Sequence, residues 1–339
     1  MGDVPMLQLL PPSAAPARAA RGQARSRRII AVGGGKGGIG KSLVSANLGI
    51  ELARRGRKVV LVDADLGGAN LHTTLGLEMP KRTLSDFIER RVGKMDDVLT
   101  PTGIANLSLV SGALDHVDAA NPRYAQKMRL LRHVQQLDSD YAILDLGAGT
   151  HSNVLDFFLV SDHGVLVLVP EPTSVENAYR FLKAAFWRRL RNVAHVFGYD
   201  PLLRSLLTTA PFRSPVELVA TVMERDREAG QNLVRQLAAF RPRLVVNQAR
   251  TAQDKEIGPA IAAAWRKYFG LQMDYLGHLP YDDDMWRVQR ARRPLLVERP
   301  DAPAARAFGG LVDALLALDA VIPRTTAPAP APPPPGGEP

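Results

Sequence analysis

The chain has 339 residues, 46% of them hydrophobic and 23% charged, which suits one α/β domain of roughly 250–300 residues with tails. The absence of cysteine excludes a disulfide framework, a thiolate zinc site and a cysteine-ligated iron–sulfur cluster, and it fits a reducing cytoplasm. The net charge of +9 is uneven: five Arg against Asp3 give residues 1–28 a charge of +4, and thirteen Arg or Lys against five acids give residues 179–250 a charge of +8.

Both ends of the chain have compositions typical of disordered segments. Residues 1–27 are rich in Ala, Pro and Arg without a hydrophobic period, and residues 321–339 are dominated by Pro and Ala. Residues 28–320 are therefore predicted to form the folded domain. Because no run of about 18 consecutive apolar residues occurs, no transmembrane segment is expected.

Within this domain, short β-branched runs alternate with helical patterns. The alternation predicts an α/β fold with a doubly wound, mostly parallel sheet of seven or eight strands and helices on both faces. In chain order, strands are expected at 28–32, 58–63, 106–110, 141–146, 164–169, 243–247 and 275–279, and helices at 41–56, 122–137, 175–193, 252–269 and 304–318. Residues 192–242 interrupt the alternation with a helical pattern and predict a helical insertion.

A glycine-rich stretch joins the first expected strand to the first helix. It satisfies G-x-x-x-x-G-K-[ST] in the order strand, loop, helix: Gly35, Lys36, Gly37, Gly38, Ile39, Gly40, Lys41 and Ser42. Glycines let successive backbone N–H groups converge on a phosphate, and the following helix N-terminus adds its dipole. Lys41 is expected to reach the β- and γ-phosphates, and Ser42 to offer its hydroxyl to Mg²⁺. The sequence therefore predicts a P-loop for ATP with Mg²⁺.

Two later strands end in carboxylates. The strand at 58–63 ends in Asp63 and is followed by Asp65, and the strand at 141–146 contains Asp145 shortly before Gly147. Strand ends in doubly wound sheets face the ligand crevice, so these residues are expected beside the P-loop. Asp145 is interpreted as the Walker B aspartate that holds Mg²⁺ through its water shell. Gly147 is expected to bring a backbone N–H to the γ-phosphate.

The loop G-K-G-G-I-G-K-S resembles the deviant Walker A loop of the MinD/ParA (SIMIBI) ATPases. The resemblance implies that Lys36 reaches across a dimer to the partner's ATP. It implies that Asp63 lies near the Mg²⁺ shell and that Asp65 orients the attacking water, so that Lys36, Lys41 and Asp65 form the catalytic set. It also implies adenine contacts by Asn247 and by the region of Pro280. The stretches 67–76, 145–149 and 169–175 are most similar to the FlhG/FleN branch, which controls flagellar number and placement.

This resemblance implies a slow, partner-stimulated ATPase that forms a homodimer on Mg·ATP and controls the position or number of a cellular structure such as a flagellum. A ParA-like, nucleoid-binding partition ATPase stays open as the alternative. The basic segment 179–250 is interpreted either as a solvated helix face or as a docking surface for DNA, an acidic partner or a membrane. The expected location is cytoplasmic, with peripheral docking at a membrane, pole or nucleoid open.

Two features depart from the family pattern. Residues 1–28 show no obvious motif for activating a GTPase partner, which FlhG-like proteins commonly carry. In the last helix, the apolar stripe of Phe308, Leu311, Leu315 and Leu318 has almost no cations beside it, whereas a membrane-docking helix is basic. The stripe therefore predicts packing on the sheet.

Overall fold

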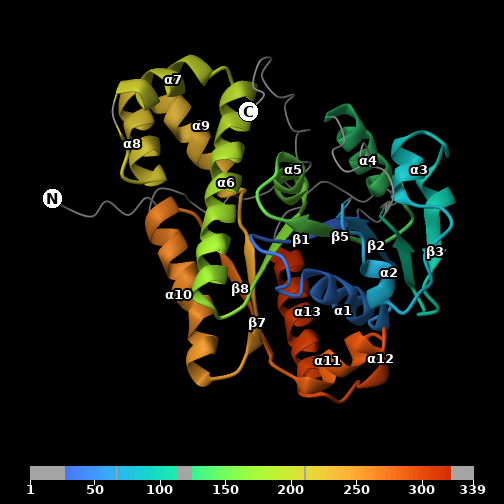
Figure 1. The fold of residues 1–339 in the computed structure, drawn as a ribbon. Helices are drawn as coiled ribbons and strands as arrows, with labels where there is room; N and C mark the ends of the chain where they lie inside the picture. Colours follow the sequence, from blue (N-terminus) through green and yellow to red (C-terminus); the bar gives the residue numbers. More distant parts are fainter. Residues whose placement is uncertain (1–26, 66, 113–123, 210, 322–339) are drawn as a thin grey trace.

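The computed structural model describes residues 27–65, 67–112, 124–209 and 211–321 (Figure 1). Most of the two predicted tails, residues 1–26 and 322–339, lies outside this range. Eight strands form one sheet in the order β3-β4-β2-β5-β1-β6-β7-β8. Seven of them are parallel, with bounds β1 Arg28–Gly34, β2 Val59–Ala64, β4 Leu107–Val110, β5 Tyr141–Ala148, β6 His163–Leu168, β7 Arg243–Ala249 and β8 Asp274–Pro280. These confirm the seven predicted strands and the predicted fold class.

The remaining strand, β3 (Leu99–Pro101), is the one that the sequence pattern did not indicate. It pairs antiparallel with β4 at the edge of the sheet. Its three residues are too few for a period of two to be visible, and they end in proline, which is tolerated at an edge because no ladder hydrogen bond is needed there.

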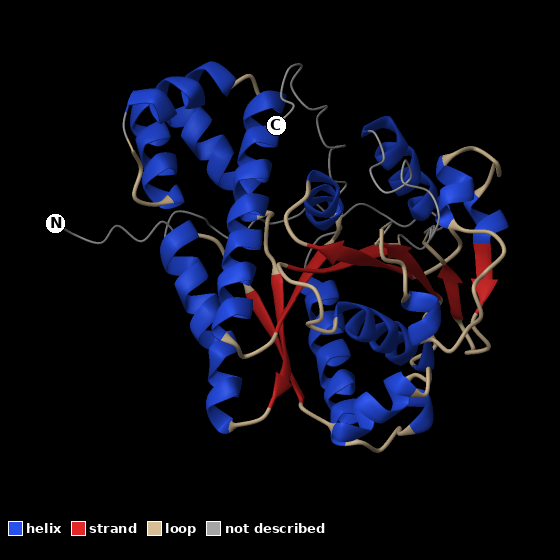
Figure 2. Ribbon diagram, in the orientation of Figure 1, coloured by secondary structure: helices blue, strands red, loops and turns tan. Residues whose placement is uncertain are grey.

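Helices cover both faces of the sheet (Figure 2). One face packs against α1 (Lys41–Arg54), α2 (Leu71–Thr74), α11 (Asp283–Arg290), α12 (Leu295–Glu298) and α13 (Pro303–Val321). The other packs against α3 (Leu84–Ile88), α4 (Tyr124–Gln136), α5 (Ser152–Val160), α6 (Pro172–Val196) and α10 (Ala252–Phe269). Successive strand residues alternate between the two cores: Ile29 belongs to one and Ile30 to the other. This is the pattern of buried parallel strands.

The predicted helical insertion contains three helices: α7 (Asp200–Thr209), α8 (Pro215–Arg225) and α9 (Arg227–Ala238). They pack against one another and against the distal half of α6, away from the sheet in Figure 1. Helix α6 runs to Val196 rather than to the predicted 193, so the added helices begin only at Asp200.

Helix α13 carries the apolar stripe at the end of the chain. Phe308, Leu311 and Leu315 are at most 2% exposed and join the core formed with β8 and α1. The prediction that this stripe packs on the sheet is confirmed. None of the helices in the described ranges is long and apolar enough to cross a membrane.

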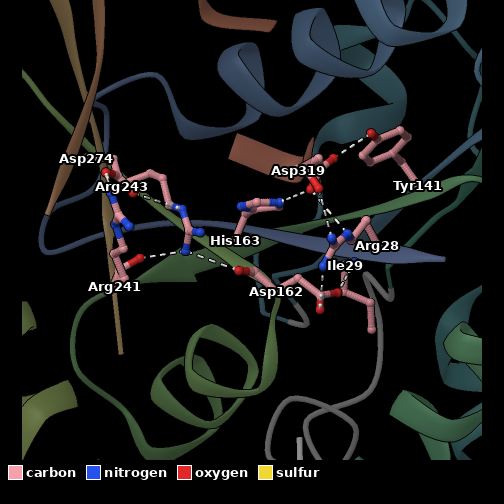
Figure 3. A network of polar contacts seen from close by, with 9 residues as sticks. All are labelled: Arg28, Ile29, Tyr141, Asp162, His163, Arg241, Arg243, Asp274 and Asp319. Carbon is pink, nitrogen blue, oxygen red and sulfur yellow. Dashed lines mark hydrogen bonds and ion pairs between the residues drawn. The ribbon is translucent and has the colours of Figure 1, made fainter. Parts of the chain in front are cut away.

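A network of polar contacts closes the amino-terminal ends of the strands (Figure 3). Asp319, near the end of α13, accepts a hydrogen bond from the Tyr141 hydroxyl at 2.6 Å, pairs with the Arg28 guanidinium at 3.2 Å, and contacts the His163 ring. The network ties the last turn of α13 to β1, β5 and β6. It lies at the end of the sheet opposite to the P-loop, because β1 begins at Arg28 and runs into the loop after Gly34.

Candidate nucleotide-binding site

The predicted P-loop lies between β1 and α1. A Cβ added to Gly35 would lie 2.2 Å from the Asn177 carbonyl oxygen, so the loop passes too close to α6 for any other residue. Gly40 has φ +90, a left-handed conformation that favours glycine, and it is followed directly by the first turn of α1. A Cβ on Gly37 or Gly38 would meet no atom within 4 Å. The loop is thus packed against α6 at Gly35 and unobstructed at Gly37 and Gly38, so that its backbone is accessible to a phosphate.

The two lysines of the loop have opposite surroundings. Lys41 is 8% exposed, and its Nζ lies 3.5 Å from the Lys36 carbonyl oxygen. Burial lowers the pKa of Lys41, while the carboxylates of Asp145 and Asp65 oppose this shift. The Lys36 side chain is 44% exposed, and its Nζ lies 3.7 Å from a Glu171 carboxylate oxygen at the start of α6. One lysine therefore belongs to the interior of the site and the other to its outer surface.

Strand register brings two of the predicted aspartates side by side. Asp63 on β2 lies opposite Asp145 on β5, and Val32 on β1 lies on the other side of Asp145. Both carboxylates are 1% exposed. Burial raises the pKa of Asp63, and the neighbouring charge of Asp145 adds to the shift. Burial raises the pKa of Asp145 as well, and hydrogen bonds from Ser42 and Ser45 partly offset this rise.

The contacts of Asp63 show a role that the sequence did not indicate. Its two carboxylate oxygens accept backbone N–H groups from Asp65 at 3.2 Å and from Leu71 at 2.9 Å. These bonds fasten the loop that carries Asp65, together with the start of α2, to the end of β2. The contribution of Asp63 to the Mg²⁺ shell stays a prediction.

The loop that carries Asp65 also meets the end of β5. A Cβ on Gly147 would lie 3.0 Å from the Asp65 Oδ1 atom, so the glycine permits the close approach of this carboxylate. Two residues later, the backbone N–H of Gly149 donates to the Gly34 carbonyl oxygen at 3.3 Å. Gly147, which is predicted to sense the γ-phosphate, and Asp65, which is predicted to orient the attacking water, are thereby brought close to the P-loop.

The residues predicted to contact adenine lie at the ends of neighbouring strands, where Ala249 pairs with Pro280. Asn247 is 1% exposed, and its Nδ2 donates to the Ile39 carbonyl oxygen at 2.9 Å. Its Oδ1 accepts the backbone N–H of Gln248, also at 2.9 Å. The Asn247 amide thus holds the backbone of the P-loop through a hydrogen bond to Ile39. A contact of Asn247 with adenine stays a prediction.

The donor set fits a magnesium ion that arrives with a nucleotide. Asp63, Asp65, Asp145 and Lys41 interact electrostatically, and when all are ionised they leave two negative charges uncompensated. Within the described residues, no group of three or more His, Cys, Asp or Glu could hold a metal alone. Mg²⁺ at NTPase sites keeps several waters and is bound through one or two carboxylates and the substrate phosphates, so a protein-only cage is not needed.

The sequence reading missed Ser45 and Glu171. The Ser45 hydroxyl donates to Asp145 Oδ1 at 2.8 Å, and the signal for it was its position one turn after Ser42 on the same helix face. Glu171 and Lys36 lie 135 positions apart in the sequence, so no local pattern could indicate that they pair.

A parallel sheet with a P-loop after its central strand β1 and buried aspartates on the neighbouring strands β5 and β2 defines a P-loop NTPase. The family described as NUBPL iron-transfer P-loop NTPase, within the ParA group, matches residues 25–191. The chain belongs to the MinD/ParA family of P-loop NTPases.

Among individual proteins, the chain is similar to the antiactivator FleN of Pseudomonas aeruginosa, with 28% identity over 283 residues and 83% of each chain covered. It is similar to the septum site-determining protein MinD of Synechocystis, with 37% identity over 46% of this chain and 58% of that protein. The flagellum site-determining protein YlxH of Helicobacter pylori matches 46% of this chain at 30% identity, over 53% of its own length. The MinD and YlxH matches therefore span little more than half of those proteins.

The fold is also that of solved MinD structures. The Pyrococcus furiosus cell division ATPase MinD aligns with a TM-score of 0.59 and 24% identity, over 86% of this chain and 99% of that one. The Pyrococcus horikoshii MinD, solved with Mg-ADP, gives the same TM-score and identity over 87% and 98%.

Proposed function

We propose that this chain is an ATPase switch that binds Mg·ATP, dimerises face to face around it and hydrolyses it slowly under the control of a partner protein. The observation that carries the proposal is the contrast between the two lysines of one loop. Lys41 is buried beside Asp145, where a phosphate bound by the loop would lie. Lys36 extends outward, and in the part of the chain that the structure describes its ion-pair partner is the exposed Glu171. It is therefore accessible to a nucleotide held by a second copy of the chain.

The roles within one subunit follow from the geometry. Residues 35–42 would bind the phosphates, and Ser42 and Asp145 would hold the magnesium ion, which supplies charge neutralisation at the transferred phosphate. Asp65, which is held against Gly147, would orient the attacking water. Because phosphoryl transfer depends mainly on positioning and electrostatics, a slow basal rate is expected until a second Lys36 completes the site.

The cellular role we infer is control of the number or position of a flagellum or a polar structure. Similarity to FleN over 83% of each chain supports it, as does similarity to a flagellum site-determining protein. A nucleoid-binding partition role has less support, because part of the positive charge of the basic segment is neutralised within the fold. Several of its cations are paired within the fold: Arg180 with Glu176, Arg188 with Asp156, and Arg241 and Arg243 with Asp274.

Light scattering coupled to size exclusion tests the dimer directly. Asp65→Ala in saturating Mg·ATP should have twice the 36.8 kDa mass of the single chain, and the single-chain mass in Mg·ADP. Adding Lys36→Ala should abolish the dimer without abolishing ATP binding. Lys58→Ala, which removes an exposed lysine from the opposite end of β2, serves as the matched control and should leave the dimer intact. A single-chain mass for Asp65→Ala in Mg·ATP would refute the proposal.

A further inference from the structure

Ser45 lies on the second turn of α1 and is completely buried, at 0% exposure. Its hydroxyl donates a hydrogen bond of 2.8 Å to Oδ1 of Asp145. Ser42, three positions earlier, lies on the same face of the helix and also hydrogen-bonds Asp145. Two hydroxyls of one helix therefore converge on a single carboxylate of β5.

The two serines differ in what they can reach. Ser42 is partly exposed at the first turn of α1, directly after the P-loop, so its hydroxyl can serve a bound ion as well as Asp145. Ser45 is enclosed by the core between α1 and the sheet and cannot reach such an ion. Among the described residues, Asp145 is the side chain to which its hydroxyl hydrogen-bonds. The function of Ser45 must therefore act through Asp145.

Asp145 needs such a contact because its carboxylate is 1% exposed and stands beside another buried carboxylate, Asp63. A buried carboxylate without donors would rotate or turn away from its neighbour, since water cannot solvate it. The hydrogen bond from Ser45 holds Oδ1 in place and so restricts the rotation of the carboxylate. Ligands of the outer shell commonly determine how well an inner group serves a metal.

We propose that Ser45 is a positioning residue for magnesium: its hydroxyl fixes the Asp145 carboxylate in the orientation that receives the hydrated ion. This inference rests on the proposed function, because it requires that Asp145 serve Mg²⁺ in a nucleotide complex. It goes beyond that function by assigning metal affinity to a residue that touches neither nucleotide nor ion. A purely structural serine would affect folding stability and leave the magnesium dependence unchanged.

The test measures binding of a fluorescent ADP analogue, first in EDTA and then during titration with Mg²⁺. For Ser45→Ala we expect an affinity in EDTA within about twofold of the unmodified chain. The Mg²⁺ concentration that gives half of the magnesium-induced gain in affinity should rise tenfold or more. Ser45→Thr, which restores a hydroxyl, should return this concentration toward its original value.

Ser85→Ala is the matched control. Ser85 is also a buried helical serine, 2% exposed, and its hydroxyl has no hydrogen-bond partner among the residues that the structure describes. Its removal should leave both the EDTA affinity and the magnesium midpoint unchanged. If Ser45→Ala does not fold, as judged by circular dichroism, Ser45→Cys fills the same space with a weak donor and should raise the midpoint in the same direction.

Three results would overturn the inference. One is a magnesium midpoint for folded Ser45→Ala within twofold of the unmodified chain. Another is an equal loss of ADP affinity with and without Mg²⁺, which would mean that Ser45 shapes the P-loop instead. The third is an unmodified chain whose ADP affinity does not respond to Mg²⁺. That result would also remove the magnesium role from the proposed function, whereas the first two would leave it standing.

Discussion

Replacing Asn247 with alanine separates two roles for one side chain. The resemblance to the MinD/ParA family predicts that Asn247 contacts adenine. The structure places its Nδ2 at 2.9 Å from the Ile39 carbonyl oxygen, inside the P-loop. A Cβ on Gly40 would lie 2.3 Å from the same nitrogen, so the amide is packed directly against the loop. We therefore expect Asn247→Ala to loosen phosphate binding itself.

The size of the effect follows from the burial of the bond. Asn247 is 1% exposed, so the Ile39 carbonyl oxygen would lose its donor in a place that water reaches poorly. Leaving a buried acceptor without a partner costs about 1–3 kcal/mol. If the loop must restore its geometry when phosphate binds, a cost of about 2 kcal/mol appears as a roughly 30-fold loss of affinity.

Calorimetry with two ligands distinguishes the roles. ADP carries a base, and pyrophosphate carries the same phosphates without one. Support of the loop predicts that Asn247→Ala weakens both ligands by a similar factor, whereas a base contact predicts that it weakens ADP alone. Asn232→Ala is the matched control, because Asn232 is a partly buried asparagine that donates to the Tyr199 hydroxyl in the distant helical insertion. Unchanged pyrophosphate binding in Asn247→Ala would refute the supporting role.

Lys41→Ala should weaken ATP binding thirtyfold or more, because it removes a buried cation from the phosphates at a cost of about 2–5 kcal/mol; tight binding by this variant in calorimetry would contradict the P-loop assignment. Asp319→Ala should lower the free energy of unfolding by about 1–3 kcal/mol, because it removes the acceptor of the Tyr141 and His163 side chains and one of the two carboxylates beside Arg28, which keeps Asp162. Burial alone would raise the pKa of Asp319, but contacts with His163, Tyr141 and Arg28 outweigh it and hold the pKa below its usual value. Its contribution is therefore present above about pH 4 and lost as the pH falls through the lowered pKa, so denaturant midpoints of the two proteins should differ at pH 7 and converge in acid. A difference that grows in acid would contradict this sign.

Local patterns in the sequence were sufficient for the seven parallel strands and the P-loop. Most of the parallel strands contain a run of β-branched and aliphatic residues, and β8, with only two leucines among its seven residues, is the exception. The helix predicted at 252–269 has those same bounds in the structure. The glycines, Lys41 and Ser42 are contiguous, so their arrangement is determined by one strand–loop–helix unit. The short helices α2, α3 and α12 were not predicted, because four or five residues cannot show a helical period.

The partners of the site residues could not be predicted in the same way. The Ser45 hydroxyl and Asp145 lie 100 positions apart, and the Asn247 amide and Ile39 lie 208 positions apart. Such contacts depend on the order of the strands, which places β5 beside β1 and brings Asn247 near the end of β7 into contact with the P-loop. The motif and the family resemblance predicted the residues of the site, but only the fold shows which of them contact one another.

The basic segment shows why a charge count along the chain does not define a surface. Within residues 200–238, which contain the three added helices, five arginines are balanced by five acidic residues. The excess of positive charge comes from α6 and from the ends of β7. Arg243 there is 4% exposed and lies among Asp274, Arg241 and the Asp162 carbonyl oxygen, and burial lowers its pKa to about 10. A guanidinium in that position organises the amino-terminal ends of the strands and cannot attract DNA or lipid. Any docking by this segment must therefore depend on its exposed cations, such as Lys183 and Arg191 on α6, and not on its net charge.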